Sequence, residues 1–119
     1  MPDIALHTRL RAGSEAAYER LHARIPAAMV AALQEAGVRD WRIWRDGQDL
    51  FHLVDVADYP VMREVLRTHP ANVAWQAQVA EVLEVADDLS GKDDSLPLLW
   101  TLLDQIAEQA AAPLPRADS

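Results

Sequence analysis

Apolar and polar residues alternate at the start of the chain. In residues 3–10, DIALHTRL, every second side chain would point to the same side of an extended segment, and one of the two sides is largely apolar. Alternation of this kind predicts a half-buried β-strand. One face carries Ile4, Leu6, Thr8 and Leu10, and the other carries Ala5, His7 and Arg9.

The pattern then changes to spacings of three and four residues, which predicts a single amphipathic helix over residues 15–36. Ser14 is placed to cap its first turn, and the charge of Glu15 is favourable there. Gly37 follows as a C-terminal stop. The apolar stripe of this helix consists of Leu21, Ile25, Ala28, Met29, Ala32 and Leu33.

Two further strands are predicted around a tight turn. The segments VRDWRIWR, residues 38–45, and LFHLVDVA, residues 50–57, are rich in β-branched and aromatic residues. Asp46 and Gly47 between them form a strong hairpin signal. The two segments should therefore pair as antiparallel neighbours.

A second helical region is predicted over residues 58–86, where an aspartate and a proline are typical of an opening turn. Pro70 interrupts this region. A polar loop over residues 87–95 follows. The short apolar segment LPLLWTLL, residues 96–103, is consistent with a final strand, and Pro97 favours a position at the sheet edge.

The order β-α-β-β-α-β is that of the ferredoxin-like α+β fold, an antiparallel four-stranded sheet with two helices on one face. The other sheet face would expose Trp, Leu, Val and His side chains. Pairing of two sheets would cover it, so we expect a homodimer, a dimeric α/β barrel. Residues 1–103 should form this domain and residues 104–119 a C-terminal extension that is partly frayed.

Composition narrows the classes of function. The 119 residues include 19 acidic and 11 basic ones, a net charge of -8, which argues against nucleic-acid or anionic-membrane partners. The lack of cysteine excludes disulfides, thiolate nucleophiles and Cys-based metal sites. No apolar run approaches the ~20 residues of a membrane-spanning helix, and the first residues do not resemble a signal peptide. We therefore expect a cytoplasmic protein without a metal site.

Candidate chemistry lies in AAYERLHARIP, residues 16–26. Tyr18 and His22 are four residues apart, so on a helix they point to the same side, beside the apolar stripe. Pro26 has no N–H to bond the carbonyl of residue 22, which predicts a kink next to His22. A histidine can act as an acid or a base near neutral pH. The pattern alone also fits a structural histidine, and both interpretations stay open.

The long helix, the aromatic WRIW, the hairpin, LFHLVDV and a tryptophan on the second helix together resemble the L-rhamnose mutarotase family over residues 3–103. The most specific part is Y-x-x-x-H followed by proline on the first helix. The resemblance implies a small dimeric isomerase that interconverts the α and β anomers of a 6-deoxy-hexose, of the L-rhamnose or L-fucose class, without a metal or cofactor. It also implies that His22 is the proton donor and that Tyr18 binds the sugar.

Further substrate-binding positions are implied by the same resemblance, with two departures. Trp41 stands where the family usually has a sugar-binding tyrosine, and it fits a core or dimer-interface position equally well. Trp75 and Gln76 stand where the family tends to carry two adjacent tryptophans. These departures leave the identity of the sugar open.

His7, His52 and Asp55 lie in strands that are predicted to be central. Either histidine could face the cavity as the second acid–base group, and either could instead be a hydrogen-bonded interior residue. Asp55 shares a face with Phe51 and Leu53, so it needs a partner, either a sugar hydroxyl or a basic side chain.

Other classes of function remain compatible with this architecture. It also hosts cofactor-independent monooxygenases and lactone isomerases, for which Trp41, Trp44 and Trp75 could line a flatter, more apolar site. A small-ligand-binding dimer without catalysis is a third alternative. Fold alone does not separate these classes.

Overall fold

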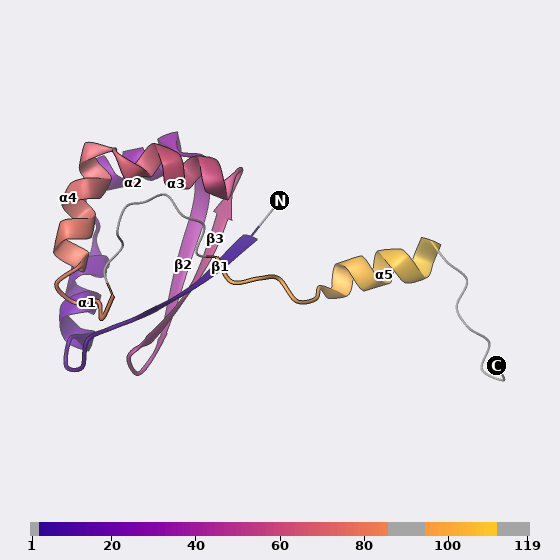
Figure 1. Ribbon diagram of the computed structural model, residues 1–119, viewed down its shortest axis with the longest axis horizontal. Coiled ribbons are helices and arrows are strands. Elements are labelled where there is room, and N and C mark those ends of the chain that lie inside the picture. Colours follow the sequence, from indigo (N-terminus) through magenta and orange to yellow (C-terminus); the bar gives the residue numbers. More distant parts are fainter. Residues whose placement is uncertain (1–2, 86–94, 112–119) are drawn as a thin grey trace.

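The computed structural model describes residues 3–85 and 95–111, and its sheet has three strands (Figure 1). They are β1 (Asp3–Arg9), β2 (Val38–Asp46) and β3 (Asp49–Val56), all antiparallel in the order β1-β3-β2. The three strands predicted from the first half of the chain are confirmed. Gly47 has a φ of 59°, so it supplies the left-handed residue that a two-residue hairpin turn requires.

The single helix predicted over residues 15–36 is wrong, because the segment forms two helices. They are α1 (Glu15–Ala23) and α2 (Ala27–Glu35), and Pro26 is the N-cap residue of α2. A proline disfavours helical backbone at the residue before it and lacks the N–H of a continuing helix. The C-cap residue of α1, Arg24, lies two positions before Pro26 and is already extended, with a φ of -158° and a ψ of 105°. Proline therefore produces a break in the helix instead of the expected kink.

The second helical region is also divided, into α3 (Tyr59–Arg67) and α4 (Pro70–Val79). The Asp58 carboxylate caps α3 by accepting from the Val61 N–H, and the His69 ring caps α4 by accepting from the Ala71 N–H. Beyond α4, Leu83 forms an isolated antiparallel bridge with Leu10. Four helices thus replace the expected two.

The final strand predicted over residues 96–103 is wrong. Residues 96–101 have no regular secondary structure, and α5 (Leu102–Ala111) begins within the predicted strand. Pro97 cannot donate to a strand ladder. Thr101 caps α5, since its Oγ1 accepts from the Asp104 N–H at 3.2 Å.

The expected boundary between residues 103 and 104 consequently falls within α5. Of the predicted frayed extension, residues 112–119 lie outside the described residues. The described part of the chain is an α+β fold with a three-stranded antiparallel sheet, and no four-stranded sheet forms among its residues. No helix among them is long and apolar enough to cross a membrane.

Helices α1 to α4 cover one face of the sheet, and the core lies between them and the strands (Figure 1). The largest fully buried side chains come from β3, from α3 and from the residue after β1: Leu10, Leu50, Val54, Val56 and Met62. We call the opposite face the helix-free face. Strand alternation and register place on it Ala5, His7, Arg9, Arg42, Trp44, Asp49, Phe51, Leu53 and Asp55.

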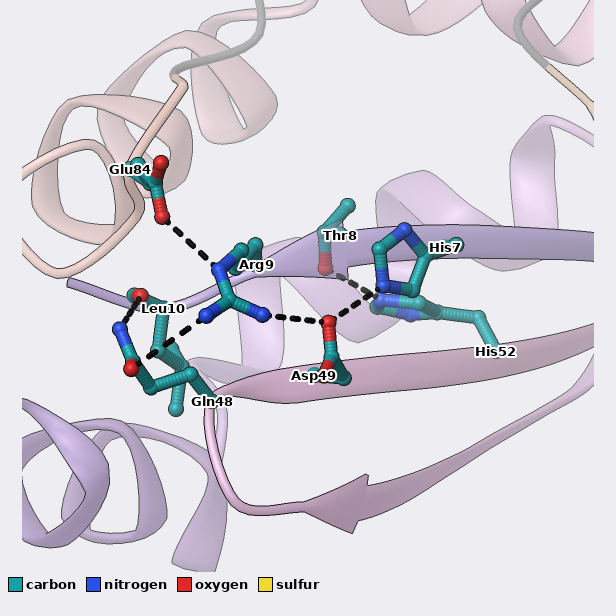
Figure 2. Close-up of polar contacts among 8 residues, drawn as sticks. All are labelled: His7, Thr8, Arg9, Leu10, Gln48, Asp49, His52 and Glu84. Atoms are coloured by element: carbon teal, nitrogen blue, oxygen red, sulfur yellow. Dashed lines mark hydrogen bonds and ion pairs between the residues drawn. The ribbon is translucent and has the colours of Figure 1, made fainter. Parts of the chain in front are cut away.

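A polar cluster fastens the end of β1 to the hairpin and to the segment after α4 (Figure 2). Arg9 donates to Asp49 at 2.9 Å and to Glu84 at 3.1 Å. Gln48 donates to the Leu10 carbonyl at 3.0 Å. Hydrogen bonds from His7 and Arg9 also hold the pKa of Asp49 below its usual range. These bonds hold the end of β1 in place, and β1 is one of the strands that line the core side of the sheet.

Candidate active site

Three aromatic rings from two helices meet at the inner side of the helical layer. The Tyr18 and His22 rings of α1 stack, with centroids 4.0 Å apart and an interplanar angle of 26°. The Trp75 ring of α4 approaches His22 edge-on, at 5.1 Å and 70°. The i, i+4 pair predicted from the sequence thus lies together, and the fold adds the predicted Trp75 to it.

The hydrogen bond of His22 defines which ring nitrogen is available for chemistry. Nδ1 lies 3.2 Å from the Tyr18 carbonyl oxygen, which can only accept, so Nδ1 carries the proton. In the neutral ring Nε2 is then the nitrogen with a free lone pair. Burial lowers the pKa of His22, and the bond to the Tyr18 carbonyl partly opposes this shift. His22 is therefore a neutral base at neutral pH.

Burial has the opposite consequence for Tyr18. The side chain is 6% exposed, and its desolvation raises the pKa of the phenol to about 12. The hydroxyl stays protonated throughout the physiological range, so it can donate and accept hydrogen bonds but does not supply a charge.

The sheet supplies a second group of side chains, joined by hydrogen bonds, which we call the Trp41–His52–Thr8 chain. Trp41 Nε1–H donates to His52 Nδ1 at 3.1 Å. Because an indole N–H only donates, His52 Nδ1 is unprotonated and the neutral ring carries its proton on Nε2. That nitrogen lies 2.9 Å from Thr8 Oγ1 and donates to it (Figure 2). Because Thr8 Oγ1 accepts this hydrogen bond, its own O–H can donate to another group.

One cavity of about 860 Å³ is bordered by the three aromatic rings of the helices and by the Trp41–His52–Thr8 chain. Tyr18, His22 and Trp75 line it from the helices, and Trp41, His52 and Thr8 line it from the sheet. Its volume is within the range of small-molecule sites, ~300–1,000 Å³. Apolar surface predominates, with a few polar groups that converge on the space. A small polar ring with one apolar face matches such a lining.

Asn72 is a cavity residue that the sequence analysis missed. It is 4% exposed, donates to the Leu66 carbonyl at 2.9 Å and accepts from Gln76 Nε2–H at 3.3 Å. It thereby holds the predicted residue Gln76 at the cavity wall. The signal for Asn72 was its spacing: a polar residue three and seven positions before Trp75 and Val79 lies on the buried stripe of α4.

His7 and Asp55 are not brought together with Tyr18 and His22. His7 borders the cavity, but its ring belongs to the helix-free face, where it donates to Asp49 at 2.9 Å and contacts Phe51 at 5.2 Å between centroids. Asp55 on the same face pairs with Arg39 at 2.7 Å. Of the candidates on the strands, only Trp41 and His52 face the helices.

The described residues contain no group of three or more His, Cys, Asp or Glu side chains that could hold a metal ion. Charged side chains border the cavity as well as the imidazole, hydroxyl and amide groups described above: Arg9, Arg24, Arg63, Arg67 and Glu84. The arrangement can move a proton and can bind hydroxyl groups, which is the chemistry of a cyclic hemiacetal.

Comparison with known proteins identifies the family. The family model of L-rhamnose mutarotase matches residues 3–106. The chain belongs to the L-rhamnose mutarotase family. L-rhamnose mutarotase of Paraburkholderia xenovorans is 33% identical over 90 residues, which cover 74% of this chain and 83% of that protein. The resemblance noted in the sequence is confirmed, and with it the assignment to sugar mutarotases.

Solved structures show that the fold is shared more widely. L-rhamnose mutarotase from Formosa agariphila has a TM-score of 0.70 at 20% identity, covering 86% of this chain and 99% of that one. Tetracenomycin F2 cyclase from Streptomyces glaucescens, a type-II polyketide cyclase, has a TM-score of 0.59 at 17% identity, covering 85% and 96%. The fold thus hosts different reactions, so the site must decide the function.

Pro26→Ala should impair the site more than the fold. Alanine allows Arg24 and Ile25 to become helical, which joins α1 to α2 and moves the turn that carries His22. We expect more helical signal in circular dichroism, at least about tenfold slower sugar anomer exchange, and a free energy of unfolding within ~1 kcal/mol of the parent. Pro60→Ala, in the first turn of α3, is the matched control. Unchanged exchange in Pro26→Ala would show that the break is not needed.

Proposed function

We propose that this mutarotase interconverts the α and β anomers of L-rhamnose in the cavity between α1, α4 and the sheet. The observation that carries the proposal is the stacked Tyr18–His22 pair, with His22 Nε2 unprotonated beside a cavity large enough for a monosaccharide. Membership of the family supports the reaction. L-fucose and related 6-deoxy-hexoses fall within the same proposal, because the departures at Trp41 and Gln76 bear on sugar preference.

The reaction opens and closes a cyclic hemiacetal. A base removes the proton of the anomeric hydroxyl while an acid protonates the ring oxygen, and the C1–O5 bond breaks to give the open-chain aldehyde. Rotation about C1–C2 presents the other face of the aldehyde, and the reverse steps close the ring. One proton is taken up and one is returned, so the enzyme is unchanged after each cycle.

His22 is the proposed proton-transfer group, consistent with the donor role that the family resemblance implies. Its neutral Nε2 accepts the proton of the anomeric hydroxyl while the second acid–base group protonates the ring oxygen. On ring closure the second group takes its proton back, and the imidazolium donates its proton to the new anomeric oxygen. The Tyr18 ring stacks on the imidazole at 4.0 Å, within the ~6 Å over which an aromatic face stabilises a cation. This face favours the imidazolium that forms during the reaction. A positioned acid–base group contributes ~10²–10⁴-fold.

The remaining site residues are proposed to bind the sugar. The Tyr18 hydroxyl, the Gln76 amide held by Asn72 and the Thr8 hydroxyl offer hydrogen bonds to sugar hydroxyls. The Trp75 and Trp41 rings offer apolar surface. The indole N–H of Trp41 is already donated to His52, so Trp41 contributes its ring and orients His52. His52 in turn is the leading candidate for the second acid–base group.

We further propose that the protein is a cytoplasmic homodimer in which two helix-free faces meet. Trp44 and Phe51 are 52% and 44% exposed on that face, and their strands pair so that the two rings are neighbours. Such a patch is costly in water. The composition without cysteine suits a reducing compartment.

His22→Asn should abolish most catalysis while the fold persists. Asparagine retains hydrogen-bonding capacity but cannot transfer a proton near neutral pH. Saturation-transfer NMR between the L-rhamnose anomers should give a rate lower by about 10²-fold or more. Sugar binding should weaken much less, because the proton in transfer belongs to the transition state. L-Fucose, D-ribose and D-galactose, tested alongside, define the specificity.

Tyr18→Phe is the matched control, since it keeps the ring stack and removes one hydroxyl. A lost hydrogen bond of ~0.5–1.5 kcal/mol corresponds to about tenfold at most. Exchange by His22→Asn at the rate of the parent would refute the assignment of His22.

The pH dependence follows from the lowered pKa of His22. If the neutral ring is the active form, exchange is constant above pH 6.5 and falls only as pH drops through the pKa of the folded state, which lies below 6.5. The free energy of unfolding should change in the same direction as the rate. The contribution of His22 to it is fully present above the unfolded pKa of ~6.5 and is lost as pH falls through the folded pKa. Rates and urea midpoints between pH 5 and 8 test both. An increase in rate on acidification would instead identify the imidazolium as the resting form.

Trp41→Phe should slow exchange, because it removes the donor that keeps His52 Nδ1 unprotonated while it retains an aromatic ring. We expect a fall of about tenfold, the scale of one hydrogen bond, with an altered preference among the tested sugars. Trp44→Phe makes the same change on the helix-free face and should leave the rate intact. Equal effects of the two substitutions would argue against a role of the Trp41–His52–Thr8 chain.

A further inference from the structure

The first turn of α4 determines where the cavity residues of that helix lie. Asn72, Trp75 and Gln76 all border the cavity, and they follow the N-cap residue His69 within about two turns. In a rigid helix, the position and rotation of the first turn set the direction of every side chain that follows. The way in which His69 holds this turn therefore bears on the site.

A histidine is not among the residues that are preferred at such a cap, which are the short side chains of Ser, Thr, Asp and Asn. Pro70 occupies the first helical position and has no N–H, so the Ala71 N–H is the first donor of α4 that needs a partner. His69 Nδ1 accepts from it at 3.1 Å. A short polar side chain could do the same, so the cap alone does not account for the ring.

The second nitrogen of the ring makes a bond that a short cap residue could not reach. Because Nδ1 accepts from the Ala71 N–H, the neutral ring carries its proton on Nε2. Nε2 donates to a carboxylate oxygen of Glu35, the last residue of α2, at 3.2 Å. We call this bond the Glu35–His69 brace. It joins the start of α4 to the end of the helix that begins after the Pro26 break.

The end of α3 holds the same turn from another direction. Asn72 is 4% exposed and donates to the Leu66 carbonyl at 2.9 Å, and the His69 N–H donates to the same carbonyl at 3.2 Å. Asn72 also accepts from Gln76 at 3.3 Å. The start of α4 is thus bonded to the ends of two different helices, which restricts both its translation and its rotation.

We propose that His69 is a positioning residue of the sugar site: its ring, held between Glu35 and the Ala71 N–H, sets the rotation of α4 that presents Trp75 and Gln76 to the sugar. This inference rests on the proposed function, which includes those two sugar contacts. His69 is not one of the described residues that border the cavity. Its substitution should therefore act on sugar affinity through α4 and leave proton transfer by His22 on α1 largely unchanged.

His69→Ala removes the cap and the brace together. We expect KM for L-rhamnose, from saturation-transfer NMR at several sugar concentrations, to rise about three- to tenfold, the scale of one helix cap. The value of kcat should stay within about twofold of the parent. His69→Asn restores the cap but does not reach Glu35, so its KM should lie between the two. No recovery in His69→Asn would refute the contribution of the cap.

Asp58→Ala is the matched control, because it removes the cap of α3, a helix that carries none of the proposed sugar contacts. It should lower the urea midpoint as His69→Ala does and leave KM unchanged. The proposal is overturned by an unchanged KM in His69→Ala, and equally by the same rise of KM in Asp58→Ala.

Substitutions of Glu35 test the brace. Glu35→Ala removes the acceptor and should raise KM about two- to threefold, the scale of a weak hydrogen bond. Glu35→Gln keeps an oxygen that accepts from Nε2 and should match the parent. In the His69→Asn background, which has already lost this bond, Glu35→Ala should add nothing. Additive effects of the two substitutions would refute the brace.

An NMR signal of Trp75 separates this proposal from the proposed function. The indole N–H resonance of Trp75, assigned with Trp75→Phe, should shift in His69→Ala and stay in place in Asp58→Ala, with no sugar present. A parent that does not exchange L-rhamnose anomers would refute the proposed function, and the resonance would still report the position of α4. A Trp75 resonance that is indifferent to His69→Ala would refute the positioning role even in an active enzyme.

Discussion

The break that Pro26 imposes between α1 and α2 is the constraint on which the site depends. A continuous helix would satisfy the carbonyls of the last turn of α1 with the N–H groups of the residues that follow. The break ends α1 at Ala23, one residue after His22. His22 therefore occupies a helix end, where its ring can bond back to the Tyr18 carbonyl. That bond fixes the tautomer and leaves Nε2 as the unprotonated ring nitrogen, the atom proposed to transfer the proton.

Burial then gives two neighbouring aromatic residues distinct chemical states. The same desolvation lowers the pKa of His22 and raises that of Tyr18, because it disfavours the charged form of each. The result is an uncharged imidazole stacked on a protonated phenol, at the wall of a cavity whose lining also includes charged side chains from Arg9, Arg24, Arg63, Arg67 and Glu84. Trp75 from α4 completes this environment across a long sequence separation.

Strand alternation divides the sheet between two tasks. The inner faces of β1, β2 and β3 carry Thr8, Trp41 and His52, which form one hydrogen-bonded chain at the cavity. The outer faces carry His7, Trp44 and Phe51, an aromatic row open to solvent in one copy. A shift of one residue in register would exchange these sets. The Arg9 cluster at the end of β1 and the Asp46-Gly47 turn at the hairpin hold that register.

Local sequence determined the three strands, the hairpin turn and the pairing of Tyr18 with His22, because each depends on residues within about a turn or a strand of one another. The family resemblance supplied the reaction. Tertiary structure decided which strand face the helices cover, and so why His52 and not His7 joins Trp41. It also brought Trp75 to His22 and gave Asn72 its role at Gln76. For residues 96–103, apolar content suggested a strand, whereas the Thr101 cap and Pro97 favour a helix beyond an unpaired segment. The physical reason is common to these cases: periodicity identifies an apolar face, but only packing against distant residues determines what covers it.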